Sequence, residues 1–178
     1  MWFENSTYWN FGMSFLVNPY SYVVAETQYC QTVWDEAVPI GVWYGGGSRT
    51  GVQFLTGHTA IGESLTKATQ HLKKTGSPTG TMYVRIYNSS GTAQFTFGSM
   101  DVSTLTGTTV SYQFENATGY TLQANDVLAS EFTGGDSSNY VRTTKYNASG
   151  FTNENYVDYP SESFRFSSGK GNSYCVTY

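Results

Sequence analysis

The chain has 178 residues, a net charge of −4, 12% charged residues and 17% aromatic residues. A disordered chain would be rich in charge and poor in aromatics, so we expect a folded protein, with residues 1–178 forming one domain. No basic cluster exceeds Lys73-Lys74, which argues against a nucleic-acid partner, and no run of about 18 apolar residues predicts a membrane span.

Residues 1–41 form a leading segment that is dense in aromatic side chains. Two strands are predicted at residues 14–17 and 21–24, around the turn Asn18-Pro19. Pro39 indicates a sheet edge or a break. The apolar side chains require burial, either in the first strands of their own domain or against a neighbouring subunit. The candidates for a subunit contact are Trp2, Phe3, Trp9, Phe11, Phe15, Leu16 and Val17.

The next two segments are a glycine-rich stretch and an element of mixed pattern. Residues 44–51, Y-G-G-G-S-R-T-G, predict a flexible loop. Residues 61–74 fit a helix by the spacing of Ile61, Leu65, Ala68 and Leu72. Read as a strand, the same segment places alternate residues from 66 to 72 on one face. We predict a strand, because the rest of the chain has the pattern of β-structure.

The remainder of the chain shows short alternating runs between turn-rich stretches. Met82, Val84 and Ile86 fall on one face of the first run, whereas Tyr83, Arg85 and Tyr87 fall on the other. Strands are predicted at residues 82–86, 95–97, 110–114, 127–132, 140–146, 163–167 and 174–178. The pattern predicts an all-β fold, a two-sheet, jelly-roll-like β-sandwich with little or no helix.

Four motifs resemble a known family when they are taken in order. They are S-L-T-K-A-T-Q-H-L-K-K-T-G-S-P-T-G-T-M-Y-V-R-I-Y (64–87), D-V-S-T-L (101–105), G-Y-T-L-Q-A-N-D (119–126) and E-F-T-G-G-D-S-S-N-Y-V (131–141). Over about residues 50–178 the chain is similar to the jelly-roll domains of the choice-of-anchor type, found in secreted, cell-surface and phage or virus-like proteins. The resemblance implies a carbohydrate-binding-like sandwich outside a cell or on a particle, and it implies no catalytic residues. The chain departs from the family in its leading segment and in the short loop between residues 86 and 101.

The two cysteines, Cys30 and Cys175, lie near opposite ends of the sequence. In an oxidising compartment we expect a disulfide between them; the alternative is two separate buried thiols. Neither they nor the two histidines, His58 and His71, have the paired spacing of a metal site. We therefore expect no metal and no cofactor.

The sequence contains no signature of catalysis. There is no G-x-S-x-G motif, and only His58 and His71 could serve as a base. Glu131, Asp136 and Asp158 are candidate carboxylates for glycoside cleavage, but nothing in the sequence pairs them, so we expect them to be solvated and the protein not to be an enzyme. Asp136 in G-G-D-S-S-N-Y suits either a calcium site or an Asx-type turn, and we predict the turn.

Sugar binding is more plausible for this chain than catalysis or calcium binding, because aromatic side chains can stack on sugar rings. The candidates for carbohydrate contact are Trp43, Tyr44, Tyr140, Arg142, Tyr146, Tyr156 and Tyr159. Ordinary packing between the sheets is the alternative for the Tyr140 face, whereas Tyr156 and Tyr159 are expected in a polar loop. Candidate N-glycosylation sequons begin at Asn5, Asn88, Asn116 and Asn147, the last three in predicted turns.

These features together predict a non-enzymatic structural or adhesive subunit of a surface filament, sheath or virion. It would assemble with copies of itself through the sandwich and the leading segment. The expected location is extracellular, on a cell surface or on a virion. The alternative is a monomeric carbohydrate-binding module whose partners are glycans.

Overall fold

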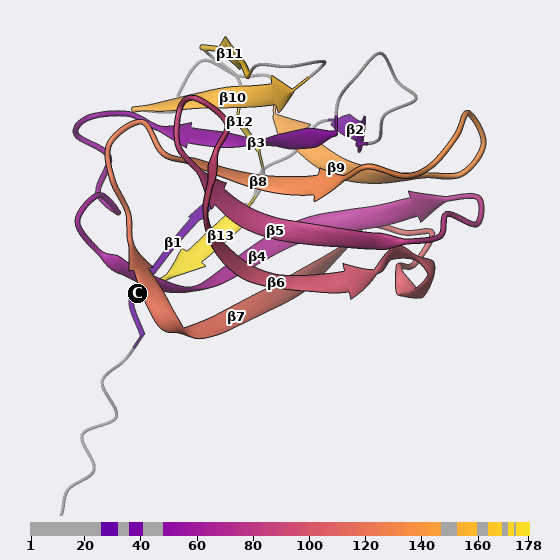
Figure 1. Ribbon diagram of the computed structural model, residues 1–178, viewed down its shortest axis with the longest axis horizontal. Coiled ribbons are helices and arrows are strands. Elements are labelled where there is room, and N and C mark those ends of the chain that lie inside the picture. The colour runs from indigo at the N-terminus through magenta and orange to yellow at the C-terminus, as the bar shows by residue number, and fades with distance from the viewer. Residues whose placement is uncertain are drawn as a thin grey trace, which may run out of the picture.

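The computed structural model describes residues 26–31, 36–40, 48–146, 153–159, 164–168, 171–172 and 174–178. These residues form two antiparallel sheets of seven and six strands that pack face to face (Figure 1). The helical element among the described residues is a single 3-10 turn at Val102–Thr104. The prediction of an all-β, two-sheet sandwich is confirmed.

The six-stranded sheet runs from top to bottom in Figure 1, and every neighbouring pair is antiparallel. Its strands, in spatial order, are β11 (Arg165–Ser167), β10 (Glu154–Tyr159), β3 (Arg49–Phe54), β8 (Val127–Phe132), β5 (Thr81–Tyr87) and β6 (Ala93–Asp101).

The seven-stranded sheet is organised around the 12-residue strand β4 (Ser64–Thr75). One edge of β4 pairs with β7 (Val110–Thr121), and the other edge is shared by β13 (Tyr174–Thr177) and β9 (Tyr140–Tyr146). β1 (Gln28–Gln31) adds to β13, whereas β2 (Glu36–Ile40) and β12 (Gly171–Asn172) add to β9. Residues 61–74 thus contain a strand, as predicted.

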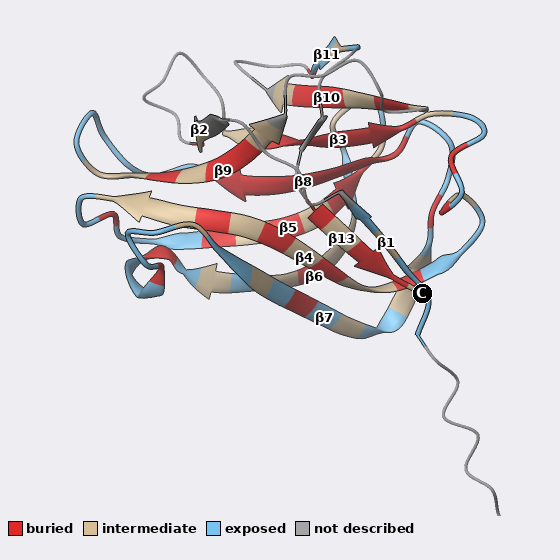
Figure 2. Cartoon of the chain, turned by 180° about the vertical axis from the view of Figure 1, so that it is seen from behind, coloured by how far each residue is buried: buried red, intermediate tan, exposed pale blue. Residues whose placement is uncertain are grey.

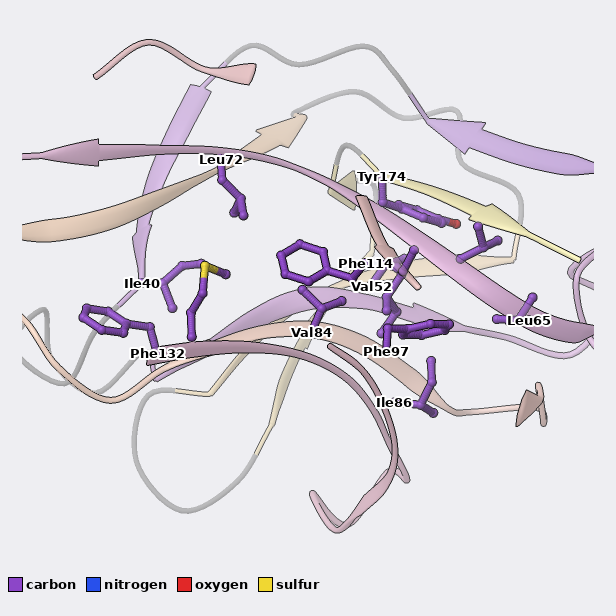
Figure 3. Close-up of a cluster of buried hydrophobic side chains, with 14 of the residues drawn as sticks. Ile40, Val52, Leu65, Leu72, Val84, Ile86, Phe97, Phe114, Phe132 and Tyr174 are labelled. Carbon is purple, nitrogen blue, oxygen red and sulfur yellow. The ribbon is translucent and has the colours of Figure 1, made fainter. Parts of the chain in front are cut away.

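The core lies between the sheets and is built from their alternating inner positions. In β5, Met82, Val84 and Ile86 are 0% exposed, which confirms the predicted alternation. Figure 3 shows side chains from both sheets meeting in this core: Ile40, Val52, Leu65, Leu72, Val84, Ile86, Phe97, Phe114, Phe132 and Tyr174.

The outer face of the six-stranded sheet carries a second, smaller cluster. It consists of Tyr87, Val127, Ala129, Val157 and Phe164. Because this cluster covers the outer side, β8 is buried at all six positions (red in Figure 2). β7, in contrast, is mostly exposed or half-buried.

Two sequence predictions about this sheet are wrong. Tyr156 and Tyr159 lie in β10 and not in a polar loop, because Tyr156 faces the core and Val157 faces the outer cluster. A loop was predicted at residues 44–51, but β3 begins at Arg49. Gly51 serves packing there, since a side-chain carbon at this position would lie 1.9 Å from the Leu128 carbonyl oxygen.

The predicted strands at residues 14–17 and 21–24 lie outside the described residues. The same holds for the subunit-contact candidates Trp2, Phe3, Trp9, Phe11, Phe15, Leu16 and Val17. Within the described ranges, no helix has the length and hydropathy that a membrane span requires.

Candidate functional site

A buried carboxylate, Glu154, lies between the two sheets at the start of β10. Its side chain is 0% exposed. Its Oε1 atom accepts three hydrogen bonds, from Tyr29 Oη at 2.8 Å, His58 Nε2 at 2.9 Å and Tyr174 Oη at 2.9 Å. Its Oε2 atom is buried and has no hydrogen-bond partner among the described residues. The three donors come from separate parts of the chain, so the cluster exists only in the assembled fold.

A disulfide fixes two of these donors. Cys30 and Cys175 are bonded to each other and lie directly opposite in the pairing of β1 with β13. Tyr29 immediately precedes the first cysteine, and Tyr174 immediately precedes the second. The predicted disulfide is confirmed, and it is consistent with an oxidising, extracellular setting.

The histidine of the cluster has both ring nitrogens engaged. The backbone N–H of Ala60 donates to His58 Nδ1 at 3.1 Å, so the proton of the ring lies on Nε2 and is donated to Glu154. The ring also contacts Tyr29 and Phe54 edge-on, at centroid distances of 4.5 Å and 4.8 Å. While these contacts hold, His58 has no free nitrogen with which to activate a nucleophile.

The phenol of Tyr174 is held in its protonated form. Complete burial raises the pKa of Tyr174 well above its ordinary value, and the negative charge of Glu154 raises it further. The hydroxyl is therefore held as a hydrogen-bond donor to the carboxylate.

A cavity of about 180 Å³ adjoins the cluster. It lies between the turn that joins β3 to β4 and the residue that precedes β10, and it is lined by Tyr29, Gly57, His58, Thr59 and Asn153. The two chain segments are joined where Leu55 N–H donates to the Asn153 carbonyl at 2.8 Å. Two of the lining residues, Tyr29 and His58, are also donors to Glu154, so the carboxylate lies directly behind the cavity wall.

A second carboxylate, Glu131, lies on the outer face of the six-stranded sheet. Arg49 Nε donates to its Oε1 atom at 2.9 Å, and Tyr87 Oη and Arg85 Nη1 donate to its Oε2 atom. Burial alone would raise the pKa of Glu131, but the hydrogen bonds and the two guanidinium charges outweigh it and lower the pKa. The expectation of a solvated carboxylate is wrong, because Glu131 is 8% exposed and paired with two cations.

The other two acidic candidates have local roles. Asp136 Oδ1 accepts the backbone N–H groups of Ser138 at 2.7 Å and Asn139 at 2.9 Å, which confirms the Asx-type turn. The side-chain hydrogen bond from Asn139 lowers the pKa of Asp136. Asp158 lies in β10, 3.4 Å from Arg165 Nε. Within the described ranges, no group of three or more His, Cys, Asp or Glu side chains is placed to hold a metal.

The carbohydrate-contact candidates separate in the structure. Tyr140 and Arg142 share the outer face of β9, both half-buried, with Arg142 Nη2 donating to Tyr140 Oη at 2.8 Å. Tyr156 is only 7% exposed and has Lys145 Nζ 5.6 Å from its ring centre, so it cannot present a stacking surface. Trp43 and Tyr44 and the side chains of Tyr146 and Tyr159 lie outside the described residues.

Two of the four sequons can be placed. Asn88 lies in the predicted turn between β5 and β6, where its Oδ1 accepts the backbone N–H groups of Ser90 and Thr92. Asn116 lies within β7 and not in a turn, and its Nδ2 donates to the Thr96 carbonyl of β6 at 2.9 Å. That prediction was wrong because β7 extends to Thr121 in its pairing with β4. Asn5 and Asn147 lie outside the described residues.

Sequence reasoning did not identify the Glu154 cluster. One signal for it was present, since each cysteine is preceded by tyrosine, at 29–30 and at 174–175. A disulfide between paired strands therefore also places two tyrosines near each other. Nothing in the sequence linked them to His58 or Glu154.

No protein-family model, no curated protein and no solved structure matches the chain. The resemblance to choice-of-anchor domains therefore reduces to what the fold itself shows, an all-β sandwich of two sheets, with no family type attached.

Proposed function

We propose that the protein is a non-enzymatic structural or adhesive subunit that acts in an extracellular setting and binds copies of itself through its leading segment. The observation that carries this proposal is the position of β1. It is the terminal strand of the order β1-β13-β4, and the described residues place no strand on its far side. The outer edge of a terminal strand can offer N–H and C=O groups to a strand of another chain.

The attachment of β1 supports the same proposal. The disulfide and a pair of backbone hydrogen bonds between Thr27 and Tyr178, at 3.0 and 3.1 Å, fix this edge to the sandwich. The aromatic leading segment precedes this fixed edge in the sequence. A contact made by that segment would therefore be transmitted to the whole sandwich.

The described surface itself has little apolar area with which to assemble. Among the described residues, the exposed large hydrophobic side chains are Val110, at 38%, and Phe166, at 42%. The leading segment, in contrast, supplies Trp2, Phe3, Trp9, Phe11 and Phe15. We assign the apolar part of the contact to that segment for this reason.

Deleting residues 1–17 tests this assignment. The oxidised full chain should form ordered particles or filaments that grow with concentration, seen by negative-stain electron microscopy and sedimentation velocity. The shortened chain, which retains β1 and the disulfide, should remain monomeric. The matched control is Phe166→Ser, in β11 of the six-stranded sheet, and this variant should assemble normally. Assembly by the shortened chain, or a monomeric full chain, would overturn the proposal.

A glycan-binding module remains the second candidate, on the observation that Tyr140 and Arg142 lie on an outward-facing strand surface. Binding to a glycan array should then fall at least tenfold with Tyr140→Ala, since an aromatic stacking platform would be lost. Tyr83→Ala is a matched control, because Tyr83 is also a half-buried tyrosine beneath an arginine, on the other sheet. Equal losses in the two variants would count against a site at Tyr140.

A further inference from the structure

We propose that the cavity beside Glu154 binds a small organic ammonium ion. This site is separate from the assembly function proposed above. It rests on three features: a buried carboxylate without a counter-charge, a cavity at its back, and aromatic rings that form the wall between the two.

The first feature is the lack of charge compensation at Glu154. Its three donors are the hydroxyls of Tyr29 and Tyr174 and the Nε2 atom of His58, whose Nδ1 atom accepts the Ala60 N–H. No lysine or arginine of the described chain forms an ion pair with it, and its Oε2 atom is left without a donor. Buried charges are normally paired, and a buried polar atom without a partner requires an explanation.

The second feature is the size and position of the cavity. Its volume of about 180 Å³ is more than ten times the roughly 10–15 Å³ that one water molecule requires on the same measure. Thr59 and Gly57 are exposed, so the cavity can be reached from solvent, whereas His58 is only 5% exposed and forms its inner wall. A ligand of a few heavy atoms therefore fits between the solvent and the carboxylate.

The third feature is the chemistry of the wall. Tyr29 and His58 line the cavity with aromatic rings and donate their protons away from it, to Glu154. A ring whose donor group is bound to a carboxylate is polarised toward greater electron density, because linked hydrogen bonds reinforce one another. Aromatic rings in this state attract cations, most strongly where water is excluded.

These features also exclude other ligand classes. An anion would be repelled by the charge of Glu154, with which no lysine or arginine of the described residues forms an ion pair. A metal ion would need several protein ligands, and the described residues hold no group of three or more His, Cys, Asp or Glu side chains placed for one. An alkylated ammonium ion needs no directed ligands, only a negative potential and an apolar wall, and the cavity supplies both.

The test compares choline with its uncharged isostere 3,3-dimethylbutan-1-ol on the intact, oxidised chain. Amide chemical shifts around residues 57–59 should move saturably with choline, and the isostere should bind about tenfold more weakly or worse. Glu154→Gln should reduce choline affinity to that of the isostere. Glu131→Gln removes the same charge from the outer face of a sheet and should leave choline binding unchanged.

Thr59→Lys keeps the proposal testable if Glu154→Gln does not fold. Thr59 is exposed at the cavity, so the substitution should preserve the fold and place a competing ammonium group at the site. Choline binding should then be lost, whereas Thr108→Lys, at an exposed loop position elsewhere, should bind normally. No saturable choline shift, equal binding of the two isosteres, or choline binding that survives Thr59→Lys would each overturn the proposal.

Discussion

Glu131 and Glu154 are both buried carboxylates, but different partners stabilise them. Glu131 lies between the guanidinium groups of Arg49 and Arg85, with residues of adjacent strands as its partners. The donors to Glu154 are two tyrosine hydroxyls and a histidine ring, and they come from β1, from β13 and from the turn between β3 and β4. The first site is compensated by charge within one sheet. The second depends on the sandwich being fully assembled, and on the disulfide that holds β1 in place.

Removing the disulfide should have the largest effect on stability. It should disturb the Glu154 cluster, because the bond holds two of its donors. The pair Cys30→Ser and Cys175→Ser should lower the free energy of unfolding by about 4 kcal/mol, since the bond closes a long loop in the unfolded chain. Urea unfolding of the oxidised protein and the variant measures the difference. A loss below about 1 kcal/mol would mean that other contacts of β1 suffice.

Removing the cations of Glu131 should cost nearly as much. The pair Arg49→Leu and Arg85→Leu leaves a buried carboxylate uncompensated, which should destabilise the fold by about 3 kcal/mol. Adding Glu131→Leu to this pair should recover most of the loss, because no charge then remains buried. If the triple variant is no more stable than the double variant, the loss arises from packing and not from charge.

Removing a single tyrosine hydroxyl should destabilise the protein by different amounts at the two sites. Tyr174→Phe removes one of three donors from a carboxylate that has no cation, so we expect a loss of about 2 kcal/mol. Tyr87→Phe leaves both arginines on Glu131, and its loss should be nearer 1 kcal/mol. Thermal and urea unfolding at neutral pH provide the comparison, and equal losses would contradict it.

The smallest expected effect is a pH dependence at Glu131. Because the folded pKa of Glu131 lies below its ordinary value of 4.5, its contribution is fully present above pH 4.5 and is lost as the pH falls through the folded pKa. Glu131→Gln should therefore be less stable than the parent by about 1 kcal/mol at pH 7, and the gap should close in acid. A gap that is constant from pH 7 to pH 3 would show that the charge is not responsible.

The sequence predicted those elements whose pattern is local. The bounds of β8 and β9 were predicted to the residue, because each is a β-rich run between turn residues. β4 was assigned as a strand only from its all-β surroundings. β10 was missed because Asn155 and Asp158 make it read as polar, whereas its strand character comes from pairing with β3, a hundred residues earlier.

The candidate site was less predictable than the fold for a related reason. Glu131 was noted as a carboxylate, but its two arginines lie on other strands and become its neighbours only through pairing register. The Glu154 cluster joins residues 29, 58, 154 and 174, and no spacing rule connects them. Alternation determines which face a side chain takes, but not which distant side chains share that face.

The pairing of Cys30 with Cys175 also determines how the protein would respond to mechanical load. The bond joins β1, which follows the leading segment in the sequence, to β13, and Thr27 pairs directly with Tyr178. Tension applied between the chain before Cys30 and the chain after Cys175 would pass through one covalent bridge, and the 145-residue loop of strands would bear none of it. Pulled in that direction, the oxidised sandwich should extend very little, whereas reduction of the bridge should make it extensible.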